Sequence, residues 1–321
     1  MTRPACGGGT TGAEGAATAP DAADAVVEIA EFTDPMCPWS WGAEPRLRRL
    51  LRVLGEGARH RRVFGVLFDE DDDPAPDPAA ETAWYARYVA EIATHTGAPR
   101  AERLRWVAAS SWPSSLAAAA AEAQGPLVGE RVLRRLRESA FVLGEPADTP
   151  ERVLAALAGV PGLDEARLRT ALADPAVRER VRRDRAEARR PRPEVVGLHG
   201  PGPHPGAAKE TGDGHRYALP TLVFSGPAGC RVVPGWRTVE EYLAAVAAVA
   251  PGLWPGAVPE PTAAELLERY RSLAEAELVG AAGPLPGGAR RVATGHGVLV
   301  LHPDERSGPA WESARRAGGA G

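Results

Sequence analysis

The stretch VVEIAEFTDPMCPWSW restricts the fold most, because it places a cysteine–proline pair between two patterns of different period. Residues 26–32 alternate and are β-branched, which predicts a strand. After the pair, four leucines at helical spacing predict a helix, and Pro45 within it should kink the helix or shift its start. The four are Leu47, Leu50, Leu51 and Leu54. Cys37 and Pro38 therefore lie where a strand turns into the N-terminus of a helix.

The rest of the chain predicts an α/β fold in which a block of helices interrupts a sheet. A second strand is expected at 61–68, and periodic segments closed by glycine or proline make residues 81–190 helical throughout. A proline- and glycine-rich loop spans 191–216. Two short strands, TLVF and CRVV, follow it, and then a helix at 238–250.

Capping patterns set several helix starts, and the C-terminal part predicts further elements. Thr149 precedes a proline as a good N-cap, and Thr238 forms a capping box with Glu241. Another capped helix is expected at 262–283, and strand-like residues at 290–302. The last 15 or so residues look frayed.

Charge and cysteine content exclude several classes of protein. The net charge is −4 and the pI is near 6.0, whereas a nucleic-acid-binding surface is strongly basic. The sequence has no apolar run long enough to span a membrane and no apolar core of a signal peptide. Three cysteines, Cys6, Cys37 and Cys230, do not make a secreted disulfide framework. We therefore expect a cytoplasmic protein with reduced thiols, no nucleic-acid partner and no membrane partner; the sequence leaves its oligomeric state open.

Cys37 is the candidate nucleophile. A helix N-terminus directs unpaired N–H groups and a positive dipole at its first residues, which stabilises a thiolate. From this position we expect the pKa of Cys37 to be lowered into the range of about 3.5–7.5 found at such sites. The alternative is a buried, inert cysteine, a common state of a free thiol.

Two motifs together resemble one family. DPMCPWSW, and YALPTLVFSG beyond a helical insertion, resemble the DsbA-like branch of the thioredoxin superfamily over roughly 26–250. Residues 260–302 are similar to a module appended in FrnE-type members. The resemblance implies a thioredoxin-like fold with a large inserted all-helical domain and a small C-terminal extension.

The resemblance also implies the site residues and the domain boundaries. Cys37 would be the nucleophile and Pro220 a cis-proline beside it, with Leu219 offering its backbone to the substrate. Pro38, Trp39 and Thr221 would complete the substrate-binding set. The expected domains are a disordered tail at 1–24, a thioredoxin-like domain at 25–78 and 210–250, an insert with its loop at 79–209, and an extension at 251–321.

Ser40 departs from the family motif. It stands where the second cysteine of Cys-x-x-Cys would resolve a mixed disulfide, and a hydroxyl is a poor nucleophile toward sulfur. A mixed disulfide at Cys37 would then need an external thiol, most simply one of low molecular weight used as a co-substrate, with no tightly bound cofactor. Cys6, on the tail, is a second source of that thiol, and Cys230 a weaker one.

Three functions remain open at this stage. The first is a monothiol oxidoreductase acting on protein or small-molecule disulfides. The second is a kappa-type glutathione transferase or isomerase, because CPWSW is similar to that group's SPYSW, with Cys37 in place of the serine. The third is a non-enzymatic adapter that delivers clients to a protease.

Other polar residues are weaker candidates. Trp39 and Trp41 are candidates for a rim around the thiol, and core packing is an equal alternative for Trp41. Asp34 and Glu44 are expected to be mostly solvated, although a negative neighbour would raise the pKa of Cys37. His199, His204 and His215 lack the spacing of metal ligands, so no metal site is expected. DEDDD at 69–73 is taken as a solvated turn.

Overall fold

A four-stranded sheet of order β2-β1-β5-β6 forms the centre of the protein. The computed structural model describes residues 26–70, 76–212, 214–253 and 260–307. β1 (Val27–Thr33) pairs in parallel with β2 (Ala58–Phe64) and antiparallel with β5 (Thr221–Gly226), which pairs antiparallel with β6 (Gly229–Pro234). This confirms the strands expected on both sides of the insertion, although β2 begins and ends earlier than 61–68.

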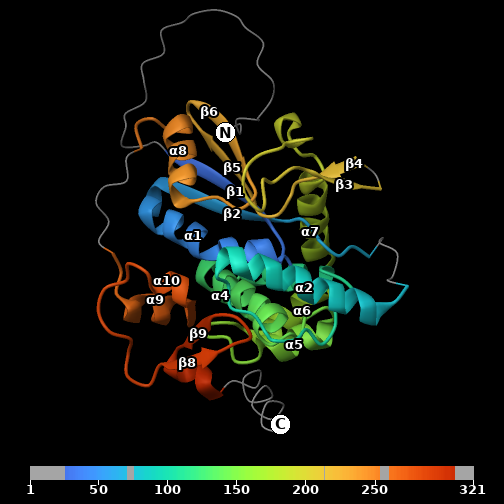
Figure 1. Cartoon of the computed structure of the whole chain (residues 1–321), viewed down its shortest axis with the longest axis vertical. Coiled ribbons are helices and arrows are strands. Elements are labelled where there is room, and N and C mark those ends of the chain that lie inside the picture. Colours follow the sequence, from blue (N-terminus) through green and yellow to red (C-terminus); the bar gives the residue numbers. More distant parts are fainter. Residues whose placement is uncertain (1–25, 71–75, 213, 254–259, 308–321) are drawn as a thin grey trace, which may run out of the picture.

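Helices cover both faces of this sheet (Figure 1). α1 (Pro38–Leu54) and α8 (Val239–Val249) pack on one face, where Ile29 and Phe224 share a hydrophobic cluster with Leu50 and Tyr242. α7 (Pro175–Ala188) packs against β2 on the other face. α1 begins at Pro38 and runs through Pro45, so the proline does not shift the helix start. The capping box predicted for α8 is present.

The helical insertion leaves the sheet after β2 and returns before β5. Its N-caps include Thr149 and Asp77, whose side chains accept backbone N–H groups. Residues 97–111 are not helical, so the expectation of helix throughout 81–190 was wrong there. Its helices are α2 (Pro78–Thr96), α3 (Trp112–Glu122), α4 (Pro126–Arg137), α5 (Pro150–Leu157), α6 (Glu165–Leu172) and α7, with a π-helical turn at Glu138–Val142.

The predicted loop 191–216 contains a hairpin that the sequence did not indicate. β3 (Lys209–Thr211) pairs with β4 (Gly214–Arg216). Each strand has only three residues, and the Pro/Gly content hides so short a pairing. The hairpin matters because both strands contribute residues to the site described below.

The C-terminal part also departs from expectation, because the predicted helix 262–283 stops early. α9 (Ala263–Tyr270) ends at Arg271, whose φ is 67°. β7 (Ser272–Ala274) and α10 (Glu275–Leu278) follow, and β7 pairs with β9 (Val298–Leu301), which also pairs with β8 (Arg290–Ala293). Leu273 is fully buried in this pairing, so burial against β9 overrides the helical pattern. The strands expected at 290–302 are confirmed.

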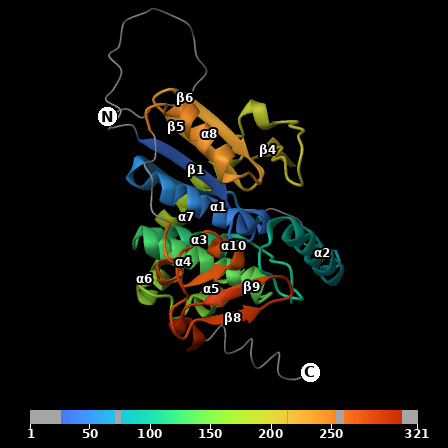
Figure 2. The same cartoon turned by 60° about the vertical axis from the view of Figure 1, so that its left-hand side comes forward.

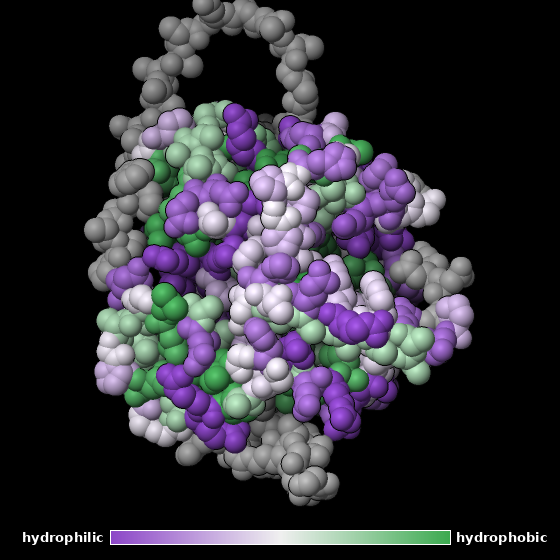
Figure 3. All heavy atoms as spheres, in the orientation of Figure 1, coloured by the Kyte–Doolittle hydropathy of each residue, from purple (hydrophilic) through white to green (hydrophobic). Residues whose placement is uncertain are grey.

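Figures 2 and 3 show how the parts are arranged. The extension lies against the helical insert, on the side away from β6 (Figure 2). Hydrophilic side chains are spread over the face in Figure 3, with smaller hydrophobic areas between them. No helix within the described ranges is both long and apolar enough to cross a membrane. The tail 1–24 and the last 14 residues lie outside the described residues, and the domain boundaries stay a prediction.

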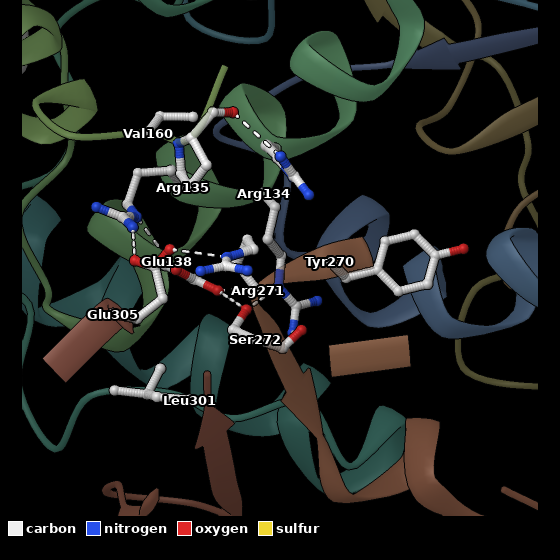
Figure 4. Close-up of a pocket in the computed structure, with 11 residues that line it drawn as sticks. Arg134, Arg135, Glu138, Val160, Tyr270, Arg271, Ser272, Leu301 and Glu305 are labelled. Atoms are coloured by element: carbon white, nitrogen blue, oxygen red, sulfur yellow. Dashed lines mark hydrogen bonds and ion pairs between the residues drawn. The ribbon is translucent and has the colours of Figure 1, made fainter. Parts of the chain in front are cut away.

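Buried ion pairs join α1, the insert and the extension. Arg134 Nη1 lies 3.2 Å from Glu44 Oε1, its Nη2 lies 3.0 Å from Glu277 Oε2, and its Nε lies 2.9 Å from Glu138 Oε1. Arg137 donates to the other oxygen of Glu44 at 2.7 Å. Figure 4 shows Arg134 and Glu138 facing Ser272 of β7, with Arg135 beside Glu305. Glu44 is therefore a buried carboxylate whose ion pairs link α1 to α4, which corrects the expectation that it is solvated.

Replacing Glu44 tests how much these ion pairs contribute to stability. We expect Glu44→Gln to lower the free energy of unfolding by about 3–5 kcal/mol, because it removes the carboxylate that pairs most closely with the buried Arg137 and leaves that arginine 3.8 Å from Glu31. Partnership with Arg48, Arg134 and Arg137 lowers the pKa of Glu44 from 4.5 to about 2 despite its burial. Its contribution is therefore complete above pH 4.5 and is lost as the pH falls toward 2.

Urea unfolding at pH 7, and at steps from pH 4.5 down to about pH 2, measures this difference and its loss in acid. Glu179→Gln is the matched control, because Glu179 is half exposed in its ion pairs with Arg182 and Arg183. Equal losses in the two variants at pH 7 would contradict the prediction.

Candidate active site

Cys37 is the N-cap residue of α1 and lies beside the segment that leads into β5. Phe32 pairs with Thr221, so the loop after β1 and the residues before β5 leave the same end of the sheet. The Cys37 thiol donates to the carbonyl oxygen of Leu219 at 3.5 Å, across 182 positions of sequence. The Leu219–Pro220 peptide bond is cis. The sheet thus brings together the motif that contains Cys37 and the motif that contains Leu219 and Pro220.

Burial reverses the expected ionisation of Cys37. Its side chain is only 4% exposed, and loss of hydration raises the pKa of this thiol above its ordinary value of 9.0. The nearby hydroxyl and backbone N–H of Ser40 and the charge of Arg216 act to lower this pKa, whereas the charge of Asp34 raises it further. The predicted range of about 3.5–7.5 was therefore wrong, because desolvation outweighs the helix N-terminus.

Ser40 lies one turn into α1 and is 2% exposed. Its hydroxyl has no conventional hydrogen-bond partner among the described residues, yet the hydroxyl and the backbone N–H lie close enough to Cys37 to lower the pKa of the thiol. Ser40 therefore offers polar stabilisation where a second thiol would stand in a dithiol motif.

Asp34 is fully buried and connects three parts of the fold. Its carboxylate accepts from the backbone N–H of Met36 at 2.6 Å, from that of Leu67 at 2.8 Å and from the hydroxyl of Ser111 at 3.1 Å. Burial raises the pKa of Asp34 to about 6, because none of these donors is charged. The expectation of a solvated Asp34 was wrong, and this carboxylate fixes the loop that carries Cys37.

A cavity of about 210 Å³ lies over the thiol, between α2 and the β3–β4 hairpin. Both elements lie on the same side of the molecule in two views (Figure 1, Figure 2). Trp39 donates its indole N–H to the hydroxyl of Tyr88 at 3.0 Å, and Tyr88 stacks on the half-exposed Trp84. The lining is Cys37, Pro38, Trp39, Leu67, Phe68, Glu81, Trp84, Tyr85, Tyr88, His204, Lys209, Arg216 and Leu219.

Two cationic side chains of this lining come from the hairpin. Lys209 is the only lysine in the sequence, and Arg216 pairs with it across β3 and β4. Glu81 on α2 is the one acidic residue of the lining. The cavity therefore combines aromatic walls with an excess of positive charge, which suits a small ligand bearing a carboxylate.

His204 is a residue of the site that the sequence did not indicate. Its ring Nε2 lies 3.0 Å from the Leu219 carbonyl oxygen, and the ring stacks on Trp39 with centroids 4.7 Å apart and planes 14° apart. Burial lowers the pKa of His204 to about 4, so the ring is neutral at neutral pH. Only its place in a long loop before Leu219 could have drawn attention to it.

Three residues named from the sequence are not in the cavity lining, although the cis bond expected at Pro220 is present. Thr221 is fully buried, donates its hydroxyl to Ala218 and does not line the cavity. Pro220 is also buried and outside the lining. Trp41 is core packing, with its indole N–H donated to the carbonyl of Pro99. The remaining predictions, Pro38, Trp39 and Leu219, do line the cavity.

Among the described residues, Cys230 and the histidines other than His204 are not in the cavity lining. Cys230 is half-buried on β6 opposite Ser225, so about 13 Å of β5 separates it from the level of Thr221. His199 is exposed, and His215 lies on β4 outside the lining. Cys6 lies outside the described residues.

The acidic run 69–73 is only partly described, and its first residue is not solvated. Asp69 is 4% exposed and accepts from the indole N–H of Trp112 and from Arg189. Residues 71–73 lie outside the described residues. Among the residues that the structure places, no group of three or more His, Cys, Asp or Glu side chains has the arrangement of a metal site.

Comparisons with known proteins agree with this geometry. A family model described as DSBA-like thioredoxin domain matches residues 28–192. Two curated relatives are each named ClpXP adapter protein SpxH: that of Halalkalibacterium halodurans is 34% identical over 142 residues, and that of Shouchella clausii is 36% identical over 141. The match covers 43% of this chain and 46% and 45% of theirs, so the chain spans about half the length of the curated relatives it matches.

A solved structure from Nitrosomonas europaea, described as a candidate protein disulfide isomerase, matches with a TM-score of 0.53. It covers 69% of this chain and 96% of its own, at 14% identity. At this identity the likeness shows the fold alone. The family model confirms the expected thioredoxin-like α/β architecture, and the order of the elements is consistent with its helical insertion.

The ionisation of Cys37 can be measured by its alkylation. With Cys6 and Cys230 replaced by serine, the rate of reaction with iodoacetamide should rise with pH through a midpoint above that of the same protein in urea, where the thiol is hydrated. Asp34→Asn should lower the midpoint, because it removes a negative charge next to the thiol. A midpoint in the folded protein at or below that in urea would contradict the effect of burial.

Proposed function

Because the chain belongs to the DSBA-like thioredoxin domain family, we propose that it is a thiol–disulfide exchange protein in which Cys37 acts as a single nucleophile. One observation carries the proposal: the only sulfur in the cavity lining is Cys37, and it lies at the start of α1 in contact with Leu219. This is where a disulfide entering the cavity would meet a thiol.

The exchange takes place in two steps, capture of a disulfide by Cys37 and release of the captured group by a second thiol. The Cys37 thiolate attacks one sulfur of a disulfide, forms a mixed disulfide with it and releases the other sulfur as a thiolate. Ser40 has no thiol with which to displace the captured group. An external thiolate therefore attacks the mixed disulfide, carries away the captured group as a new disulfide and restores Cys37.

The closed setting of Cys37 limits both partners. A thiol that is 4% exposed is reached only through the cavity, which favours a low-molecular-weight thiol as the releasing agent. Lys209 and Arg216 favour one that carries a carboxylate. The raised pKa of Cys37 makes the thiolate scarce at neutral pH but more nucleophilic once formed, so exchange should accelerate with pH. We place this reaction in the cytoplasm, where small thiols stay reduced.

A non-enzymatic adapter is the second candidate, favoured by the names of the two curated relatives and by the protonated state of Cys37. An adapter binds its client through a surface and needs no thiolate. The two functions are separated by Cys37→Ala: exchange requires the sulfur, whereas adapter binding to a client survives its loss.

The proposal is tested by the lifetime of a mixed disulfide. In protein carrying Cys6→Ser and Cys230→Ser, treatment with 2-hydroxyethyl disulfide should give a Cys37 adduct that persists until an external thiol is added. Ser40→Cys should release the adduct without that thiol, because the new cysteine displaces 2-mercaptoethanol and forms a disulfide with Cys37.

Mass spectrometry of the intact protein follows the adduct over time. Ser40→Ala is the matched control, because it removes the hydroxyl without adding a thiol, and its adduct should persist as in the parent protein. The proposal fails if no Cys37 adduct forms, or if the parent protein loses its adduct unaided as fast as Ser40→Cys.

A further inference from the structure

We infer that His204 is a specificity-determining residue of the Cys37 site: it holds the Leu219 carbonyl closed to peptide backbones, and so restricts Cys37 to small thiols and disulfides. The inference rests on the proposed exchange function and adds the class of substrate. It depends on the contacts of three groups, the Cys37 sulfur, the Leu219 carbonyl and the His204 ring.

A protein substrate would have to place its backbone beside Leu219. A disulfide holds the two Cα atoms about 4.4–6.8 Å apart, so a peptide cysteine bonded to Cys37 must run along the neighbouring main chain. The Leu219 carbonyl, which contacts the Cys37 sulfur at 3.5 Å, is the acceptor at that place. A peptide that docks in extended form needs such an acceptor, because its own N–H groups lose water on entering the cavity.

His204 already occupies that acceptor. A carbonyl oxygen has two lone pairs; His204 Nε2 takes one at 3.0 Å, and the other faces the Cys37 sulfur. The proton must be on Nε2, because a carbonyl only accepts. When a mixed disulfide forms, the thiol proton is lost, but the sulfur still fills the space on that side. A peptide N–H therefore finds neither lone pair accessible.

The contacts of His204 hold its ring against the Leu219 carbonyl, so a peptide cannot easily displace it. Its ring stacks on Trp39, which is fixed by Tyr88. Its carbonyl accepts from the backbone N–H of Trp236 at 3.2 Å. Gly235 has a φ of 81°, and a Cβ there would lie 2.3 Å from the His204 carbonyl oxygen, so only glycine allows the two segments to approach this closely.

The size of the cavity agrees with a small substrate. About 210 Å³ is below the roughly 300–1,000 Å³ of ordinary ligand sites. A disulfide with short substituents reaches the sulfur without any hydrogen bond from Leu219. A peptide has to pass the aromatic wall of α2 and then leave backbone N–H groups unpaired.

The test compares two disulfides that release the same thiol. One is 2-hydroxyethyl disulfide, and the other is a ten-residue extended peptide whose central cysteine is joined to 2-mercaptoethanol. The rate of Cys37 adduct formation is measured by mass spectrometry in protein with Cys6→Ser and Cys230→Ser. We expect His204→Ala to raise the ratio of the peptide rate to the small-disulfide rate about five- to tenfold, the worth of one recovered hydrogen bond, because a general change in the exposure of Cys37 affects both rates and leaves their ratio unchanged.

Two further variants separate this role from a general effect on the loop. His199→Ala removes an exposed histidine of the same loop and should change neither rate. His204→Gln keeps a side-chain N–H able to donate to Leu219, and should return the ratio of the two rates toward that of the parent. A ratio unchanged in His204→Ala, or raised equally by His199→Ala, would overturn the inference.

A measurement on the parent protein alone covers the case in which His204→Ala does not fold. A peptide with esters in place of the amides at the cysteine and the next residue lacks the N–H groups that Leu219 would accept. The parent protein should react with the ester peptide at least as fast as with the amide peptide, because the ester has no N–H group to leave unpaired. An amide peptide that reacts five times faster would refute the inference. If 2-hydroxyethyl disulfide itself gives no adduct, the proposed function fails and the inference with it.

Discussion

The antiparallel pairing of β1 with β5 is the constraint on which the candidate site depends. It joins two segments separated by the whole helical insertion and places the end of β1 beside the start of β5. Cys37 and Leu219 meet only because of this register; a slip of one residue would turn the alternate side chains of β5 to the opposite face. The insertion must therefore leave and re-enter the sheet at fixed points, and the contact of Asp34 with Ser111 ties it to the loop that carries Cys37.

Burial shifts the pKa values of the acidic groups at and near the site. Whether a buried carboxyl pKa rises or falls depends on whether histidine or arginine side chains surround the group. Glu31 and Glu44 are as deeply buried as Asp34, yet the pKa of each is lowered to about 2, because histidine and arginine side chains surround them. Asp34 has only neutral donors, and its pKa rises to about 6. Cys37 and His204 follow the same rule, so the pKa of the thiol rises, that of the imidazole falls, and both groups are neutral at neutral pH. The charged network thus stabilises the packing of the parts, while the cavity is lined at its base by neutral groups.

Local periods were sufficient to predict the order of strands and helices, whereas the thioredoxin-like fold and the meeting of the two motifs were predicted from their resemblance to the DsbA-like family. Strand alternation before Cys37 and leucine spacing after it determine the turn that carries the thiol. The ionisation of Cys37 could not be predicted, because desolvation depends on side chains from α2 and the hairpin. His204 was missed for a related reason: its role comes from one contact with a carbonyl. The early end of α9 at Arg271 likewise follows from pairing with β9, which no local pattern encodes.

The parts of the chain contribute differently to the chemistry of the site. The sheet and α1 supply the sulfur and the Leu219 carbonyl, which is enough to attack a disulfide but not to choose one. The selection comes from segments outside the two motifs: α2 provides the aromatic wall, the β3–β4 hairpin the positive charge, and the loop before β5 supplies His204. In the proposed exchange, Ser40 leaves release to an external thiol, so a cavity that admitted only small molecules would also determine which thiols restore Cys37. Capture and release are then limited by the same opening, so a change that admits a peptide to Cys37 would also expose the mixed disulfide to larger thiols.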